Sequence, residues 1–339
     1  MTDRDAQRRT FIDKNDWAKA ETVPVAGDAS NRRYDRLIKP TETCILMDAP
    51  PEKGEDVGPF VRIAQHLKNL GFSAPKILAE DPVNGFLLLE DLGDDLFSNV
   101  LVENSSMETM LYEAAVDVLV TLHRSAAPRL PRYDATLMTE LALLAFDWYA
   151  RGAAGAVDQS VRSRFERDLK ELLVPLDRVP GVLIQRDYHA DNLIWLPERD
   201  GIARVGLLDF QDALLGHPAY DLVSILQDAR RDVPPSLQQD MINRYVTSSG
   251  TDEDEFRFAC AALGLQRNLR ILGVFARLAI SHGKPRYVEF IPRVWSHIET
   301  CLKHPGLEPI KPQVFKYLPA PDKAVLDPLR EPCTTVPMH

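Results

Sequence analysis

The chain has 339 residues, and its 45% hydrophobic and 27% charged content is typical of a globular protein with a substantial core. Its formal net charge of −10 gives no overall attraction for nucleic acid or an anionic membrane, so we expect neither as a partner. No run approaches the length of about 18 apolar residues that a membrane span needs, and the polar N-terminus does not read as a signal peptide. The four cysteines are scattered without a C-x-x-C pair, which favours a reducing compartment and predicts a cytoplasmic protein.

The first 91 residues are typical of a small sheet with one helix. The expected elements, in chain order, are strands at 34–38 and 43–47, a helix at 60–70, and strands at 76–80 and 86–90. Gly71 is a natural end for the helix. The dipeptide Asn84-Gly85 lies between the last two strands and is typical of a hairpin turn.

From residue 92 onward the pattern is mainly helical. The clearest helical segments are 107–124, 137–150, 161–173 and 256–280, and two short apolar runs stand at 182–184 and 205–208. The tail from about residue 311 is rich in proline, and we expect it to be irregular. The sequence therefore predicts a bilobed α+β protein, with an N-terminal lobe at 1–91 and a larger, mainly helical lobe at 92–339.

Three polar residues stand at the ends of the two short apolar runs. Asp187 follows the first run, and Asn192 comes five positions later. Asp209 ends the second run, seventeen residues after Asn192. Phosphoryl transfer needs an oriented nucleophile and cations that neutralise charge on the phosphates, and carboxylate and amide oxygens suit Mg²⁺. This order of residues predicts a kinase that uses ATP and Mg²⁺; the alternative is a set of polar residues that cap turns.

The segment from Gly216 to Leu222, Gly-His-Pro-Ala-Tyr-Asp-Leu, completes a known pattern. Together with the preceding motif it resembles the aminoglycoside phosphotransferase and choline kinase superfamily, over about residues 27–280. Segments 27–34, 47–52 and 265–278 are most similar to bacterial cell-wall-recycling kinases that phosphorylate the anomeric hydroxyl of N-acetylmuramate and N-acetylglucosamine. The resemblance implies a protein-kinase-like fold.

The resemblance also implies roles for individual residues. Asp187 is expected to be the catalytic base, Asn192 and Asp209 to hold Mg²⁺, and Asp221 to bond within the catalytic loop. The residues expected to bind ATP comprise the turn over the phosphates, the two arginines that follow it and the connector beside adenine: Gly27, Ser30, Asn31, Arg32, Arg33, Glu90 and Leu92.

Two positions depart from the superfamily pattern. Gln185 stands where a histidine is usual, and the strand at 43–47 has no lysine for the phosphates. Arg32 or Arg33 could supply this positive charge, because a guanidinium binds phosphate through two nitrogens; the alternative is that both are exposed strand residues. Whether Glu52 or Glu55 is the acidic partner stays open.

On the acceptor side, His189 and Asp191 lie inside the catalytic loop and are expected to reach substrate hydroxyls. Arg267 and Arg270 lie on the long helix and are candidates to bind a sugar carboxylate, or else are ordinary helix-surface charges. His123, at the end of an earlier helix, is expected to be a core or capping histidine.

The leading hypothesis is an amino-sugar kinase of peptidoglycan recycling. One alternative keeps the fold and changes the acceptor to an aminoglycoside, choline or ethanolamine. A choline pocket would need an aromatic cage, and the sequence shows no clear aromatic cluster. The other alternative is a nucleotide-binding regulator without turnover. The missing lysine favours it, and the presence of Asp187, Asn192 and Asp209 argues against it.

Overall fold

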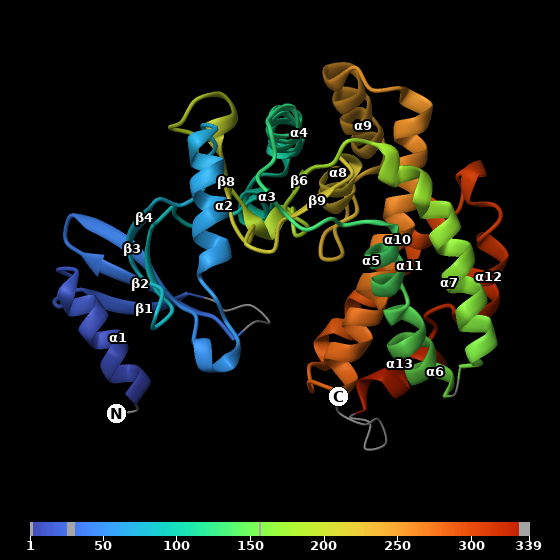
Figure 1. The fold of residues 1–339 in the computed structure, drawn as a ribbon, viewed down its shortest axis with the longest axis horizontal. Coiled ribbons are helices and arrows are strands. Elements are labelled where there is room, and N and C mark those ends of the chain that lie inside the picture. The colour runs from blue at the N-terminus through green and yellow to red at the C-terminus, as the bar shows by residue number, and fades with distance from the viewer. Residues whose placement is uncertain (1–2, 26–30, 156, 332–339) are drawn as a thin grey trace. The chain divides into compact units, whose positions relative to one another are not determined.

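The computed structural model describes residues 3–25, 31–155 and 157–331 (Figure 1). These residues pack as two compact units. The first comprises Met1–Thr121 with Ala190–Ala213, and the second comprises Leu122–His189 with Leu214–His339. The units are discontinuous in sequence because a segment from the middle of the chain packs with the first one. The lobes expected at 1–91 and 92–339 stay a prediction.

A five-stranded antiparallel sheet forms the centre of the first unit. Its strands are β1 (Glu21–Val25), β2 (Arg33–Lys39), β3 (Glu42–Asp48), β4 (Ile77–Asp81) and β5 (Phe86–Glu90). The spatial order is β1-β2-β3-β5-β4. The sequence predicted four of these strands. It missed β1, an edge strand whose residues are almost all exposed, so that no apolar alternation marks it.

Helix α1 (Asp3–Lys14) covers one face of this sheet and was not predicted. Phe11 and Ile12 are its buried residues, and they join a cluster with sheet residues Leu37, Cys44, Leu46, Phe86 and Leu88. Two ion pairs fix the helix to the strands: Arg4 with Asp48, and Arg8 with the fully buried Asp35 at 2.7 Å. In Figure 1 the strands lie between α1 and α2.

Helix α2 (Gly58–Asn69) and the hairpin after it form as the sequence predicts. The helix ends at Gly71, where the Gly71 N–H bonds to the Lys68 carbonyl at 3.0 Å and the Phe72 N–H to the Leu67 carbonyl at 3.0 Å. The hairpin turn needs glycine at position 85, because a Cβ there would lie 2.0 Å from the Ala49 carbonyl oxygen.

A second hairpin, β7 (Leu193–Trp195) and β8 (Val205–Leu207), completes the first unit. The Leu207 N–H bonds to the Ser73 carbonyl at 2.9 Å. Arg199, in the hairpin loop, donates to Glu90 at 2.7 Å. Helix α3 (Phe97–Glu103) contacts β7, and α4 (Glu108–Arg124) is the helix in which the chain passes to the second unit.

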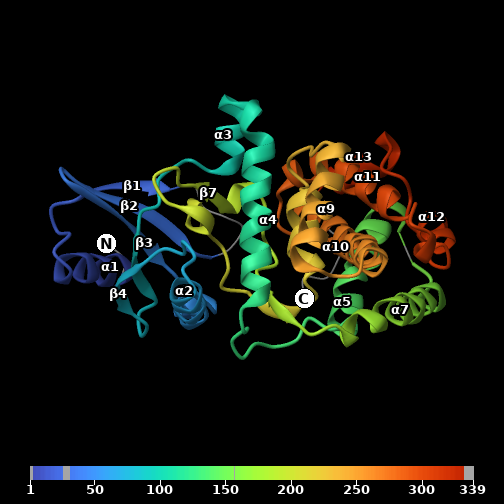
Figure 2. The ribbon, with the colours of Figure 1, turned by 90° about the horizontal axis from the view of Figure 1, so that it is seen from above.

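The long helix α10 (Glu253–Ile280) is the centre of the second unit, with α5 and α11 beside it (Figure 2). Helix α8 also packs against α10. The other elements of this unit are α5 (Ala135–Ala142), a π-helix (Ala145–Ala150), α6 (Arg151–Ala154), α7 (Gln159–Leu173), α8 (Ala219–Leu226), α9 (Pro235–Ser249), α11 (Ile291–Cys301), and strands β6 (Val182–Ile184) and β9 (Leu214–Gly216). None of the helices in the described ranges has the length and apolar character needed to cross a membrane.

The expectation of an irregular tail is wrong over the described residues. Two helices form there, α12 (Lys311–Tyr317) and α13 (Lys323–Arg330). Pro312 stands in the first turn of α12, where a helix does not need the missing N–H. Asp322 caps α13 by accepting the Val325 N–H at 2.9 Å.

Candidate functional site

In the second unit, the carboxylate of Asp221 fixes the loop that follows β6. Asp221 lies in the first turn of α8 and accepts the backbone N–H groups of Gln185 at 2.6 Å and Arg186 at 2.9 Å. It is fully buried, and burial raises its pKa to about 7. These bonds confirm that Asp221 bonds within the loop, and they set the backbone directly before Asp187.

Asp187 is the acidic group that this loop presents. Burial by itself would raise the pKa of Asp187, but electrostatic interaction with Arg270, followed by those with His189 and Arg186, lowers it below its ordinary value. Asp187 is therefore a carboxylate at neutral pH. A partly buried carboxylate held in this state can accept a proton or a hydrogen bond from a hydroxyl.

The predicted acceptor residues of the second unit differ in their surroundings. Arg270 is partly exposed, and its Nη1 donates to the Tyr220 hydroxyl at 3.4 Å. Arg267 is only 4% exposed and donates to the Gln227 carbonyl at 3.2 Å. His189 is buried, and burial lowers its pKa, so its ring is neutral at pH 7.

In the first unit, Asn192 and Asp209 lie side by side. Asn192 ends a short 3₁₀ turn before β7, and Asp209 follows β8. The Asn192 Nδ2 lies 3.5 Å from Asp209 Oδ2, and the Leu208 N–H bonds to the Asn192 carbonyl at 3.0 Å. The sequence thus identified two residues, seventeen positions apart, whose side chains meet.

Gln211 is a member of this cluster that the sequence analysis missed. Its Nε2 donates to Asp209 Oδ1 at 2.6 Å, so that it orients the carboxylate from the side away from Asn192. Phe210 is fully buried, and its ring packs on Phe60 of α2 at a centroid distance of 4.9 Å. In the sequence, only its position two residues after Asp209 could have indicated that Gln211 belongs to this cluster.

The backbone is strained directly before Asp187 in the second unit and at Asp209 in the first. Among the described residues, three that are not glycine have positive φ: Asp16, Arg186 at 74° and Asp209 at 55°. Side chains disfavour this conformation, and such residues concentrate at functional sites. Arg186 comes directly before Asp187, and Asp209 is itself a predicted metal ligand.

The expected phosphate side is only partly described, since Gly27 and Ser30 lie outside the described residues. Glu55 accepts the Asn31 N–H at 3.2 Å and the Arg32 Nε–H at 2.8 Å. Glu55, one of the two candidates for the helix partner of the missing lysine, pairs with Arg32 from the segment before α2.

The charge state of Arg32 reflects its neighbours. Burial by itself would lower the pKa of Arg32, but Tyr34, Glu55 and Asp212 raise it above its ordinary value. Asp212 stands three residues after Asp209, so this guanidinium lies near the loop that carries the predicted metal ligand. Arg33, by contrast, has a 55% exposed side chain that pairs with Asp35 at 3.1 Å.

The predicted adenine residues lie at the end of β5. The Glu90 N–H bonds to the Lys76 carbonyl at 2.8 Å, and the Glu90 side chain pairs with Arg199. Leu92 is 8% exposed. Asp191 belongs to the first unit, in the same 3₁₀ turn as Asn192.

The oxygen ligands of the first unit suit one kind of metal ion. The described ranges contain no cluster of three or more His, Cys, Asp or Glu side chains that could hold a metal by themselves. Mg²⁺ bound together with phosphates needs only one or two carboxylates, because phosphate oxygens and water complete its shell. Asn192 and Asp209 fit that requirement.

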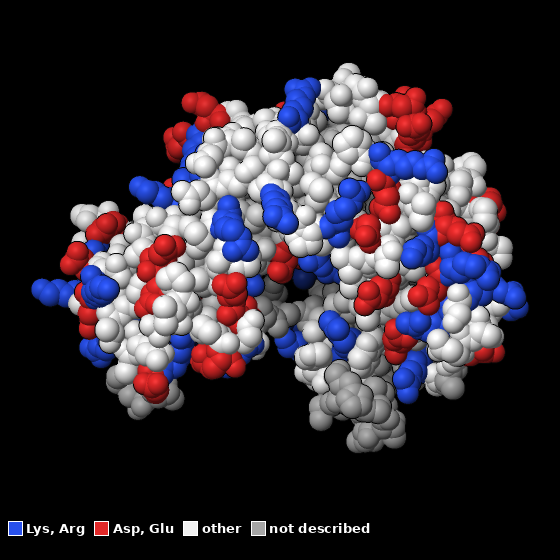
Figure 3. Space-filling model, viewed as in Figure 1, with Lys and Arg blue, Asp and Glu red and all other residues white. Residues whose placement is uncertain are grey.

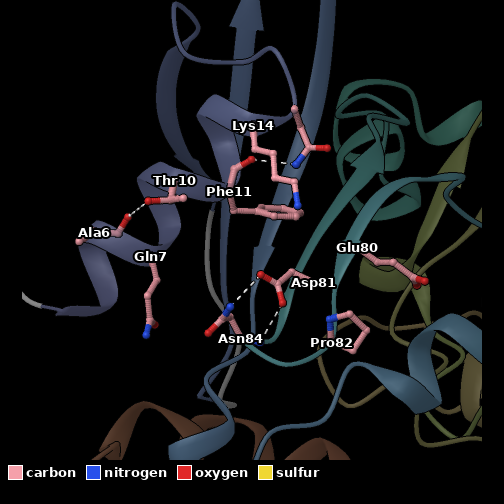
Figure 4. Close-up of a pocket in the computed structure, with 10 residues that line it drawn as sticks. Ala6, Gln7, Thr10, Phe11, Lys14, Glu80, Asp81, Pro82 and Asn84 are labelled. Carbon is pink, nitrogen blue, oxygen red and sulfur yellow. Dashed lines mark hydrogen bonds between the residues drawn. The ribbon is translucent and has the colours of Figure 1, made fainter.

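A separate groove in the first unit contains none of the predicted site residues. It lies between α1 and the β4–β5 turn and encloses about 530 Å³ (Figure 4). Thr10, Phe11 and Lys14 line it from the helix, and Asp81 and Asn84 from the turn. On the face in Figure 3, acidic and basic side chains are interspersed, as expected for a solvated surface.

The fold is that of the small-molecule kinases of the protein-kinase-like class. A family model described as "Phosphotransferase enzyme family" matches residues 21–258, and the chain belongs to this family. It is 38% identical to the N-acetylmuramate/N-acetylglucosamine kinase of Caulobacter vibrioides, over 94% of this chain and 98% of that one. It is 37% identical to the protein of the same name in Pseudomonas aeruginosa, over 84% of each chain.

Solved structures confirm the predicted fold. A choline/ethanolamine kinase family protein from Mesorhizobium loti matches with a TM-score of 0.62 and 13% identity, over 96% of this chain and 99% of that one. The choline kinase of Streptococcus pneumoniae matches with a TM-score of 0.62 and 15% identity, over 87% of this chain and 99% of that one.

Proposed function

We propose that this chain is an ATP-dependent kinase that phosphorylates the anomeric hydroxyl of N-acetylmuramate and N-acetylglucosamine, as part of peptidoglycan recycling. The observation that carries the proposal is the likeness to relatives of that name over nearly the whole chain, 38% identical over 94% of its residues in one case. Three further relatives of the same name match at 31% to 37% identity.

At the acceptor end, Asp187 is the proposed base. Its carboxylate accepts the hydrogen bond of the anomeric hydroxyl and orients the oxygen. It takes the proton as the oxygen bonds to the γ-phosphorus of ATP and the bond from that phosphorus to the leaving ADP breaks. The hydrogen bonds from Gln185 and Arg186 to Asp221 support this placement, because they fix the backbone before Asp187. His189, Asp191, Arg267 and Arg270 are the proposed contacts to the sugar.

At the nucleotide end, Asn192 and Asp209 are the proposed ligands of Mg²⁺, and Gln211 orients Asp209. The ion, when bound with ATP, supplies positive charge beside the phosphate oxygens. Arg32, held by Glu55, is the proposed basic group that replaces the missing lysine. The other proposed ATP contacts are Gly27, Ser30, Asn31, Arg33, Glu90 and Leu92.

The alternatives have weaker support. Choline, ethanolamine and aminoglycoside kinases share the fold at only 12% to 16% identity, which supports a common architecture and no common acceptor. A regulator without turnover has no chemical need for Asp187, Asn192 and Asp209 together.

The experiment is an acceptor panel. The purified protein is incubated with Mg-ATP and, separately, N-acetylmuramate, N-acetylglucosamine, choline, ethanolamine and an aminoglycoside, and ADP formation is measured. We expect ADP only with the two sugars, and a ³¹P NMR signal of a sugar 1-phosphate. ATP binding without ADP formation for any acceptor would favour the regulator, and activity confined to choline or an aminoglycoside would replace the proposed acceptor.

A further inference from the structure

Arg270 is a cationic group near Asp187 that has no carboxylate partner of its own. Its side chain is partly buried in α10, and its one described hydrogen bond goes from Nη1 to the Tyr220 hydroxyl at 3.4 Å. No Asp or Glu among the described residues forms an ion pair with it. Asp187 acts on it electrostatically without being such a partner.

Three other arginines of the second unit are paired with carboxylates. Arg257 bonds to Glu253 at 2.8 Å, Arg162 to Asp147 at 2.9 Å, and Arg293 to Asp232 at 2.6 Å. Removing a guanidinium from water is costly unless an anion or several acceptors compensate. For Arg270, the only compensation among the described residues is one long hydrogen bond to the neutral phenol of Tyr220. This arrangement is expected where a bound ligand supplies the anion that pairs with the guanidinium.

A network of buried polar groups holds the residues around Arg270. The Tyr220 hydroxyl lies 3.4 Å from that of Tyr133, and the two rings pack edge to face. Gln266, one turn before Arg270 on α10, donates from Nε2 to the Tyr133 hydroxyl at 3.1 Å and to the Met138 carbonyl at 2.8 Å. The phenols are therefore fixed, and the Arg270 binding group is preorganised on a rigid helix.

The two proposed acceptors differ in one group that matches this site. N-acetylmuramate is N-acetylglucosamine with a lactyl ether on O3, and the lactyl group ends in a carboxylate. The group lies on the same sugar ring as the anomeric hydroxyl, which the proposed function assigns to Asp187. A guanidinium that lies close to Asp187 but forms no ion pair with it can bind such a carboxylate through two parallel hydrogen bonds.

We propose that Arg270 binds the lactyl carboxylate of N-acetylmuramate and is the residue that favours this acidic sugar over N-acetylglucosamine. The inference rests on the proposed function. Arg267, the neighbouring candidate, is less suited, because it is 4% exposed and is directed to the Gln227 carbonyl inside the unit.

The first test measures kcat/KM for both sugars in wild type and in Arg270→Gln. The ratio of the N-acetylmuramate value to the N-acetylglucosamine value should fall by about 10- to 100-fold, the size of a lost charge-assisted contact. Arg270→Lys keeps the charge without the planar fork, and its ratio should lie between the other two. Arg257→Gln makes the same change on the same helix at an arginine that is already paired, and its ratio should equal that of wild type.

The second test begins with wild-type protein, so its first result does not depend on how a variant folds. Wild-type protein is assayed with N-acetylmuramate and with its lactyl methyl ester, which adds one methyl group and removes the charge. The ester should lose about tenfold or more in kcat/KM with wild type, and the acid and ester should become nearly equal with Arg270→Gln.

The outcomes separate the two proposals. Equal kcat/KM for acid and ester in wild type, or an Arg270→Gln variant that loses both sugars in the same proportion, would overturn the role of Arg270 and leave the proposed function standing. Wild type that phosphorylates neither sugar would contradict the proposed function itself.

Discussion

Arg32 and Glu55 form an ion pair in which Arg32 Nε lies 2.8 Å from Glu55 Oε2, and each side chain is 12% exposed. The other oxygen of Glu55 accepts the Asn31 N–H. In protein kinases, a lysine of the third strand pairs with a helix glutamate beside the phosphates. Strand β3 has no basic residue here, so we infer that this pair takes over that task.

The first prediction concerns this pair. Glu55→Gln should raise the KM for ATP by about tenfold, because the variant cannot hold the Arg32 guanidinium by charge. The KM for the sugar should change much less. Glu52→Gln, at an exposed position on the same segment, is the matched control. If both variants raise the KM for ATP equally, the pair has no specific part in ATP binding.

Asp187→Asn tests the proposed base. The amide cannot accept the proton, so kcat should fall by about 10²- to 10⁴-fold. Titration calorimetry with ADP should give nearly the wild-type affinity, because Asp187 has no proposed contact with the nucleotide. Wild-type turnover in this variant would show that another group is the base.

Asp209 and Gln211 are expected to affect metal activation to different degrees. Asp209→Asn should remove most Mg²⁺-dependent turnover, because it replaces the charged ligand. Gln211→Ala should raise the Mg²⁺ concentration for half-maximal rate by about tenfold, because an orienting hydrogen bond of 2.6 Å is lost. A Gln211→Ala titration that overlays wild type would argue against an orienting role.

Asp221→Asn should lower the free energy of unfolding by about 1 to 3 kcal/mol, since one oxygen then faces two buried N–H donors. Urea unfolding measures the change. Asp134→Asn is the matched control, because Asp134 caps α5 through the Leu137 N–H and asparagine caps a helix equally well. Equal stability of the two variants would mean that the loop does not depend on the Asp221 carboxylate.

The partly buried His123 predicts a loss of stability in acid. Its Nδ1 lies 2.7 Å from the Tyr245 hydroxyl, and burial lowers its pKa from 6.5 to about 3. The unfolded chain therefore binds a proton that the folded chain excludes, and stability falls as pH drops below 6.5. The expected contribution is about 1.4 kcal/mol per pH unit between pH 6 and 4.

The same unfolding experiment at pH 6, 5 and 4 should show a shallower pH dependence in His123→Gln than in wild type. His282→Gln, at an exposed histidine, is the control. Identical slopes in wild type and His123→Gln would indicate that His123 does not exclude the proton.

Local sequence patterns were sufficient to predict an element where residues within that element determine its structure. The apolar stripe of α2 and the glycine after it specify a helix and its end from residues within one segment. The Asn84-Gly85 turn works in the same way. The spacing of Asp187, Asn192 and Asp209 was informative because each residue lies close to one end of a different short strand, β6, β7 or β8.

Elements stabilised from a distance could not be predicted. Helix α1 buries only two residues, and its ion pairs join Arg4 to Asp48 and Arg8 to Asp35, positions 44 and 27 residues apart. The choice of Glu55 over Glu52 likewise depends on a contact across 23 residues. A proline-rich tail looked irregular because the apolar contacts that stabilise α12 and α13 come from elsewhere in the unit.

The hairpin of β7 and β8 has a consequence for synthesis on the ribosome. The first unit lacks residues 190–213 until they are translated. In this segment, Leu207 forms a hydrogen bond with Ser73 and Arg199 forms an ion pair with Glu90. Domains usually fold in order from the N-terminus as they emerge. Until then, Ser73 lacks its hydrogen bonds with Ala203 and Leu207, and Glu90 lacks its ion pair with Arg199, while the nascent chain grows from residue 121 to residue 213. A pause or a truncation in that interval leaves an incomplete unit, which is a natural substrate for chaperones.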